Sequence, residues 1–143
     1  PKQIERYRTR ISGPLLDRID LHVQVPAVDY AQLADTRRGE STATVRQRVE
    51  QARGVQRVRF RETPIRSNAH ISSKFLEQYA TPDVASRSLL ENAITRMGLS
   101  ARAYDRILKV SRTIADLAAS ENIQSAHVAE AIQYRVLDRP ATT

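Results

Sequence analysis

Arginines are the residues in this sequence whose type and spacing suit a chemical role. Arg18 stands between Asp17 and Asp20, just after a turn-forming Ser-Gly-Pro run. Arg102 stands in the first turn of a strongly periodic segment that begins at Ser100. A guanidinium can make two parallel hydrogen bonds to phosphate, and at a helix N-terminus it adds to a field that already favours anions. The pattern indicates contacts with a phosphate-bearing ligand, either a nucleotide or a nucleic acid.

Each of these arginines has a plainer interpretation. Arg18 between two aspartates is often only a local salt-bridge partner, and Arg102 beside an apolar stripe is often a solvated surface residue. Arg106 lies one turn beyond Arg102 and is a second, weaker candidate for the phosphate contact. Its plainer interpretation is surface charge, as for its neighbours Lys109 and Arg112.

A second concentration of arginine lies between residues 43 and 66, where seven arginines accompany only two acids. We predict a helix over 43–60, capped by Ser41 or Thr42, because its valines recur at helical spacing. The predicted apolar stripe is Val45, Val49, Ala52, Val55 and Val58. The predicted basic stripe on the opposite face is Arg46, Arg53, Arg57 and Arg61. Such a stripe suits either an interdomain or intersubunit face or contact with DNA phosphates, although aromatic rings for stacking bases are scarce.

The composition favours helices over sheets. Four glycines and six prolines occur in 143 residues, 41% of the residues are apolar, and the net charge is +7. The chain has no cysteine, which excludes thiolate metal sites, and the three histidines are too scattered to predict any metal site. No apolar run is long enough to cross a membrane and no leader is visible, so we expect a cytoplasmic protein without membrane contacts.

One strand and several further helices are predicted. Residues 20–26 alternate apolar and polar side chains and end at a proline, which is typical of a strand. A lone strand must pair with a sheet that this sequence does not contain. Further helices are expected over 3–11, from Pro14 to Ile19, and over 71–79, 82–97, 100–117 and 125–137. The stripe of the 100–117 helix is Ala103, Ile107, Val110, Ile114 and Leu117.

These features belong to three longer runs: ISGPLLDRIDL at 11–21, LSARAYDRILKVSRTIADL at 99–117, and EAIQYRVLDR at 130–139. Together they closely resemble the C-terminal region of the bacterial magnesium-chelatase-related ATPases, the ComM (YifB-like) competence family of the AAA+ superfamily. The resemblance extends over about residues 6–139 and is weakest over 63–86.

The resemblance implies a mainly α fold: a helical AAA+ lid subdomain with a short strand remnant of the preceding α/β ATPase core. Residues 1–26 would end the core, 27–40 would be a linker, 41–139 would form the lid with its long helix before the sensor, and 140–143 would be a frayed tail. Arg18 corresponds to the family's arginine finger, which acts in trans, and Arg102 to its sensor arginine.

The parent protein implied by the resemblance is a hexameric motor that uses ATP and Mg²⁺ on DNA in natural transformation and recombination. This chain lacks a G-x-x-x-x-G-K-[ST] loop and an acidic Mg²⁺ site. We therefore expect the chain alone to bind neither ATP nor Mg²⁺ and to lack ATPase activity, and its partners to be neighbouring subunits of the ring and DNA.

Two alternatives remain open on the sequence alone. The same machinery could drive metal insertion or protein remodelling, as in magnesium chelatase. The chain could instead be a stand-alone basic helical module that binds nucleic acid without nucleotide, although the unpaired strand argues against this. A phosphate-binding loop and an acidic Mg²⁺ site upstream of Pro1 would exclude the stand-alone module.

Overall fold

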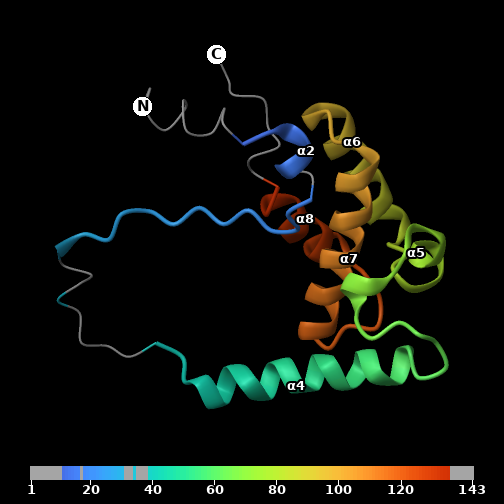
Figure 1. The fold of residues 1–143 in the computed structure, drawn as a ribbon, viewed down its shortest axis with the longest axis horizontal. Helices are drawn as coiled ribbons and strands as arrows, with labels where there is room; N and C mark the ends of the chain where they lie inside the picture. The colour runs from blue at the N-terminus through green and yellow to red at the C-terminus, as the bar shows by residue number, and fades with distance from the viewer. Residues whose placement is uncertain (1–10, 17, 31–33, 35–38, 136–143) are drawn as a thin grey trace.

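The structure is a computed structural model that describes residues 11–16, 18–30, 34 and 39–135. This part of the chain is mainly helical, as the sequence predicts (Figure 1). The elements are α2 (Gly13–Leu16), α4 (Thr42–Arg59), the 3-10 helix η1 (Asn68–His70), α5 (Ser73–Tyr79), α6 (Val84–Met97), α7 (Ala101–Leu117) and α8 (Ser125–Gln133). Apart from Ile11, the helix expected over 3–11 lies outside the described residues, as do residues 140–143.

Helix α7 is the centre of the bundle. It packs against α8, α4, α5 and η1, and α6 covers α8 (Figure 1). Ala103 and Ile107 are buried as predicted, but the predicted stripe is wrong at its C-terminal end, where Leu117 is 41% exposed. The buried face continues instead through Leu108, Ser111, Arg112, Ala115 and Asp116. Leu117 lines an open groove together with Leu21, and its side chain therefore stays outside the core.

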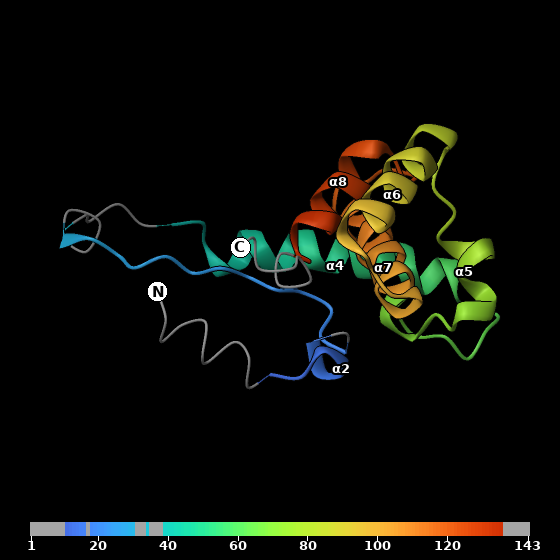
Figure 2. The ribbon, with the colours of Figure 1, turned by 90° about the horizontal axis from the view of Figure 1, so that it is seen from above.

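Helix α4 crosses the C-terminal end of α7, and its first half extends beyond the bundle (Figures 1 and 2). The predicted valine stripe on this helix is wrong, because its four valines are 37% to 70% exposed. The buried residues of α4 are Ala52 and Gln56, and Phe60 directly after the helix joins the core. Burial on α4 is decided by where it meets the bundle, along its C-terminal half, and not by where its valines lie.

Side chains cap the longer helices. Ser41 accepts a hydrogen bond from the backbone N–H of Thr44 at 3.2 Å, and Ser100 accepts one from Ala103 at 3.2 Å, as expected for N-cap serines. Helix α6 begins two residues later than predicted and is capped by Asp83, whose carboxylate accepts a hydrogen bond from the N–H of Ser86. These hydrogen bonds satisfy N–H groups that the first turn of a helix leaves without partners.

After the turn at Arg18, residues 21–29 run in an extended conformation past the end of α8 and away from the bundle (Figures 1 and 2). Residues 20–26 form no strand, because an extended segment becomes one only when a second segment completes its ladder. Within the described ranges the β contact present is an isolated bridge between Pro82 and Ile123. None of the described helices has the length and apolar character needed to cross a membrane.

Candidate functional site

Arg18 lies in the turn that ends α2. The carbonyl of Leu15 accepts a hydrogen bond from the N–H of Arg18 at 3.0 Å, and the carbonyl of Leu16 accepts one from Ile19 at 3.0 Å. Helix α2 is therefore only one turn long and ends before the predicted Ile19. The side chain of Arg18 is exposed at the surface.

Arg102 lies in the first turn of α7, where the sequence predicts it. The Ser100 cap fixes the start of this helix, and the next residue after Arg102, Ala103, is buried in the core. Arg102 is exposed, so its charge stands at the end of the helix where backbone N–H groups create a positive field. This position suits contact with an anion.

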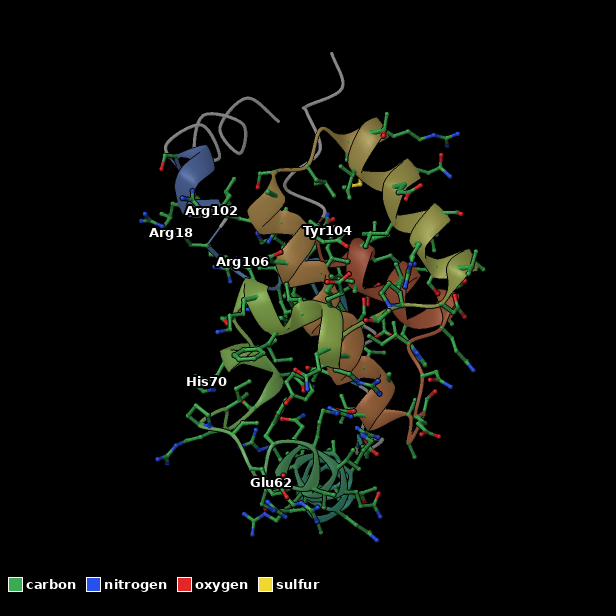
Figure 3. The ribbon with its side chains drawn as sticks, turned by 90° about the vertical axis from the view of Figure 1, so that its right-hand side faces the viewer. Arg18, Glu62, His70, Arg102, Tyr104 and Arg106 are labelled. Carbon is green, nitrogen blue, oxygen red and sulfur yellow. The ribbon has the colours of Figure 1, made fainter. Side chains whose placement is uncertain are left out.

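Arg106 joins these two segments. Its guanidinium forms a salt bridge with the carboxylate of Asp20, two residues beyond Arg18. Arg106 is also four residues beyond Arg102, which places the two on the same face of α7. Arg18, Arg102 and Arg106 consequently gather at one side of the molecule, as Figure 3 shows.

The four arginines predicted to form a basic stripe lie on α4 and just beyond it, at the opposite end of the molecule from Arg18 (Figures 1 and 3). Arg46, Arg57 and Arg61 are exposed, and Arg53 is half-buried. Arg53 donates to Gln56 at 2.9 Å, Arg57 lies 4.0 Å from Glu50, and Arg61 lies 3.3 Å from Glu62. Ion pairs this exposed contribute little to stability, so the basic face remains accessible to a partner.

A buried polar network lies where α4 meets α7. Asp116 has a fully buried carboxylate that accepts two hydrogen bonds from Arg59, one from Asn68 at 2.8 Å and one from Arg112 at 3.1 Å. Arg112 also donates to the backbone carbonyls of Ser120 and Glu121, at 2.7 and 2.8 Å. The sequence interpretation of Arg112 as surface charge is therefore wrong.

The network changes the acid–base chemistry of its members. Burial alone would raise the pKa of Asp116, but hydrogen bonds from Arg59 and Asn68, with the positive charges of Arg59 and Arg112, lower the pKa below its usual value. Burial lowers the pKa of Arg112, and the charge of Asp116 opposes this. Asp116 therefore stays ionised at neutral pH, and its role is to hold the helices together.

A helical pattern in the sequence does contain a signal for this network. Arg112 and Asp116 are four residues apart, and Arg112 also follows the buried Leu108 by four. A charged pair at this spacing on a buried face must be internally neutralised, because an unpaired buried charge is costly. The partner Arg59 lies 57 positions away from Asp116, and nothing in the local pattern identifies it.

The described residues offer no acidic cluster suited to a metal ion: no three His, Cys, Asp or Glu side chains converge there. A cleft of about 600 Å³ opens beside the buried network, between Arg59, Tyr79 and Glu121. It does not include Arg18 or Arg102. The arrangement at Arg18 and Arg102 can thus supply positive charge to an anion, but it cannot by itself hold a metal–nucleotide complex.

Comparison with known proteins decides the family. The sequence profile described as "Magnesium chelatase, subunit ChlI C-terminal" matches residues 39–135, and the profile "Magnesium chelatase, subunit ChlI" matches residues 1–33. This chain belongs to the magnesium chelatase ChlI C-terminal family. The boundary between the two profiles falls in the predicted linker 27–40.

Individual relatives agree with this assignment. The chain is 44% identical over 140 residues to the competence protein ComM of Haemophilus influenzae and 41% identical over 140 residues to the uncharacterized protein YifB of Escherichia coli. Each match covers 97% of this chain and 27% of the relative. An uncharacterized protein of Mycobacterium tuberculosis is 40% identical over 130 residues, 91% of this chain and 26% of that protein. The chain thus spans about a quarter of the length of these relatives.

The comparisons confirm the resemblance on which the sequence interpretation rests. The chain is a magnesium-chelatase-related C-terminal region similar to those of ComM and YifB, and it has the mainly helical fold of such a region. The roles of Arg18, Arg102 and Arg106, and of the arginines on α4, stay predictions.

Proposed function

We propose that this chain is the helical lid and arginine-supplying region of an AAA+ ATPase that forms a ring, and that the ring is a hexamer acting on DNA in recombination during natural transformation. Arg18 acts in trans on the nucleotide of a neighbouring subunit, and Arg102 senses the γ-phosphate. The observation that carries the proposal is the salt bridge between Asp20 and Arg106, which brings the Arg18 turn to the first turns of α7.

The physical argument concerns charge. Phosphoryl transfer spreads negative charge over the γ-phosphate oxygens, and a positioned arginine stabilises that charge. Arg18 and Arg102 are both exposed and lie at the same side of the molecule, so both charges are accessible to a ligand that approaches from that side. ATP is the substrate of this reaction. The residues described here do not fit a Mg²⁺ site, so the ion would be held by other parts of the protein.

A DNA substrate is supported by the exposed basic face on α4 and by the similarity to a protein named for competence. A second candidate function is metal insertion or protein remodelling driven by the same ATPase machinery. The match to profiles of a magnesium chelatase subunit favours it. The stand-alone nucleic-acid module has less support, because the relatives are nearly four times longer than this chain.

ATP hydrolysis by the full-length protein, measured with Mg²⁺ and with or without single- or double-stranded DNA, tests the proposal. We expect hydrolysis that DNA stimulates, and no hydrolysis by residues 1–143 alone. Hydrolysis that DNA leaves unchanged would favour the second candidate. Mg²⁺-dependent turnover by the 143-residue chain itself would contradict the assignment of this chain as a contributor of arginines only.

A further inference from the structure

The segment that follows Arg18 is attached to the lid at three consecutive points. The carboxylate of Asp20 is bound by Arg106 of α7. The carbonyl of Ile19 accepts a hydrogen bond from the guanidinium of Arg135, just beyond α8. The backbone N–H of His22 donates to the carbonyl of Tyr134 at 2.8 Å. Residues 19–22 are therefore held both by α7 and by the residues that directly follow α8.

The three contacts differ in strength. Asp20 and Arg106 are half-exposed, and an ion pair of that kind contributes little to stability although it fixes geometry. Arg135 is only 1% exposed, and a guanidinium so deeply buried must be hydrogen-bonded to be tolerated. The Tyr134 carbonyl belongs to the last turn of α8, where helix carbonyls lack partners within the helix. The attachment therefore satisfies groups that would otherwise be costly to bury.

We propose that Arg106 and Arg135 are positioning residues for Arg18. They hold residues 19–22 on α7 and α8, so that Arg18 and Arg102 approach a phosphate as one rigid unit. On this proposal, which rests on the function proposed above, Arg106 acts through Asp20 and does not contact the nucleotide. When the lid moves, residues 19–22 move with it, so Arg18 and Arg102 change position together.

A charge exchange in the full-length protein tests the role of Arg106. Asp20→Arg and Arg106→Asp each break the pair, and we expect each to lower kcat by about a hundredfold, the cost of a misplacement of about 1 Å, with a much smaller change in KM for ATP. The double variant Asp20→Arg/Arg106→Asp restores an ion pair of opposite polarity and should recover most of the activity. Arg96→Asp, on the exposed face of α6, is the matched control for an added acid and should keep normal turnover.

Two kinetic results would overturn the proposal. One is wild-type turnover in both single variants. The other is a double variant no more active than Arg106→Asp, which would mean that Arg106 touches phosphate itself. The variant Arg18→Ala separates the positioning role of Arg106 from the finger role of Arg18. If Arg18→Ala hydrolyses ATP normally, the finger role is wrong. If it is inactive while Asp20→Arg is fully active, only the positioning role fails.

Hydrogen exchange provides a readout independent of activity, and it also covers Arg135. The amide of His22 is protected by its bond to Tyr134. In Arg106→Asp and in Arg135→Lys, hydrogen exchange in the peptide 19–23 should become faster, while hydrogen exchange in α4 stays unchanged. The double variant Asp20→Arg/Arg106→Asp should restore the protection of this peptide. Unchanged exchange in 19–23 in a variant that has lost activity would overturn the proposal. Global unfolding is recognised because it would accelerate exchange in α4 as well.

Discussion

The guanidinium of Arg59 donates to both carboxylate oxygens of Asp116, at 2.8 and 2.5 Å, and so joins the last turn of α4 to the last turn of α7. Asn68 of η1 donates to the same carboxylate. Arg59 and Asn68, which lie 57 and 48 positions before Asp116 in the sequence, thus meet at one buried anion. Because the first half of α4 projects from the bundle, its orientation depends on this junction at the other end of the helix (Figure 1).

Replacing Asp116 should destabilise the fold strongly. Asp116→Asn removes the negative charge that Arg59 and Arg112 share, and an uncompensated buried charge typically costs about 3–5 kcal/mol. We expect a loss of that size in the free energy of unfolding, measured by urea denaturation. The exposed carboxylate of Glu91 on α6 offers a control, since Glu91→Gln should change stability by less than about 0.5 kcal/mol. Equal stability of the two variants would show that the network contributes nothing.

The same carboxylate should make stability depend on pH in acid. Its pKa is lower in the folded protein than the value of about 3.9 expected in the unfolded chain. Its contribution is therefore fully present above pH about 4 and is lost as pH falls through the folded pKa. The difference in unfolding free energy between the wild type and Asp116→Asn should shrink below that pH. The lowered pKa of Asp83 acts equally in both proteins and cancels. A difference that stays constant down to pH 2 would contradict the assignment.

Removing Arg102 should affect nucleotide chemistry and spare the fold. The side chain is exposed in the first turn of α7, while the core contact of that turn belongs to Ala103. In the full-length protein, Arg102→Ala should assemble normally and show weaker ATP binding or slower turnover, measured by nucleotide titration and steady-state kinetics. Arg96→Ala on α6 serves as the control. Normal binding and turnover in Arg102→Ala would remove its sensor role.

The basic stripe on α4 gives a separate prediction about DNA. If they bind backbone phosphates, the triple variant Arg46→Ala/Arg53→Ala/Arg57→Ala should bind DNA more weakly, and the slope of log K against log salt should flatten by up to about 0.9 for each phosphate that is no longer neutralised. Fluorescence anisotropy at several salt concentrations measures both. An unchanged affinity and slope would leave this face to bind another domain or subunit. None of the three side chains belongs to the buried core, so we expect the fold to be kept.

The sequence predicts helices well where local signals are strong. Ser41 and Ser100 cap α4 and α7 where expected, because a serine before a periodic apolar run is a local signal. Which side of each helix is buried is a tertiary property. The valines of α4 show this: they have the right spacing but are 37% to 70% exposed, whereas Ala52 and Gln56 on the same helix are buried.

The residues of the candidate site could be predicted only where a local motif identifies them. Arg18 and Arg102 are identified by short motifs that resemble a family, whereas the salt bridge between Asp20 and Arg106 spans 86 positions and has no local signature. The hydrogen bond from the buried Arg135 to the carbonyl of Ile19 spans 116 positions and likewise has no local signature. Long-range polar contacts between charged residues cannot be paired from one sequence, because many arginines are available to each acid.

The central claim, that Arg18 completes a nucleotide site in a neighbouring subunit, is tested most directly by mixing two inactive full-length proteins. One carries Arg18→Ala, which alone should bind ATP nearly normally and hydrolyse it about 10³–10⁵-fold more slowly. The other is disabled in the phosphate-binding loop that we expect elsewhere in the protein. We predict that mixed rings regain ATPase activity wherever an intact loop faces an intact Arg18. Normal hydrolysis by Arg18→Ala alone, or no recovery in rings shown to contain both subunits, would contradict the claim.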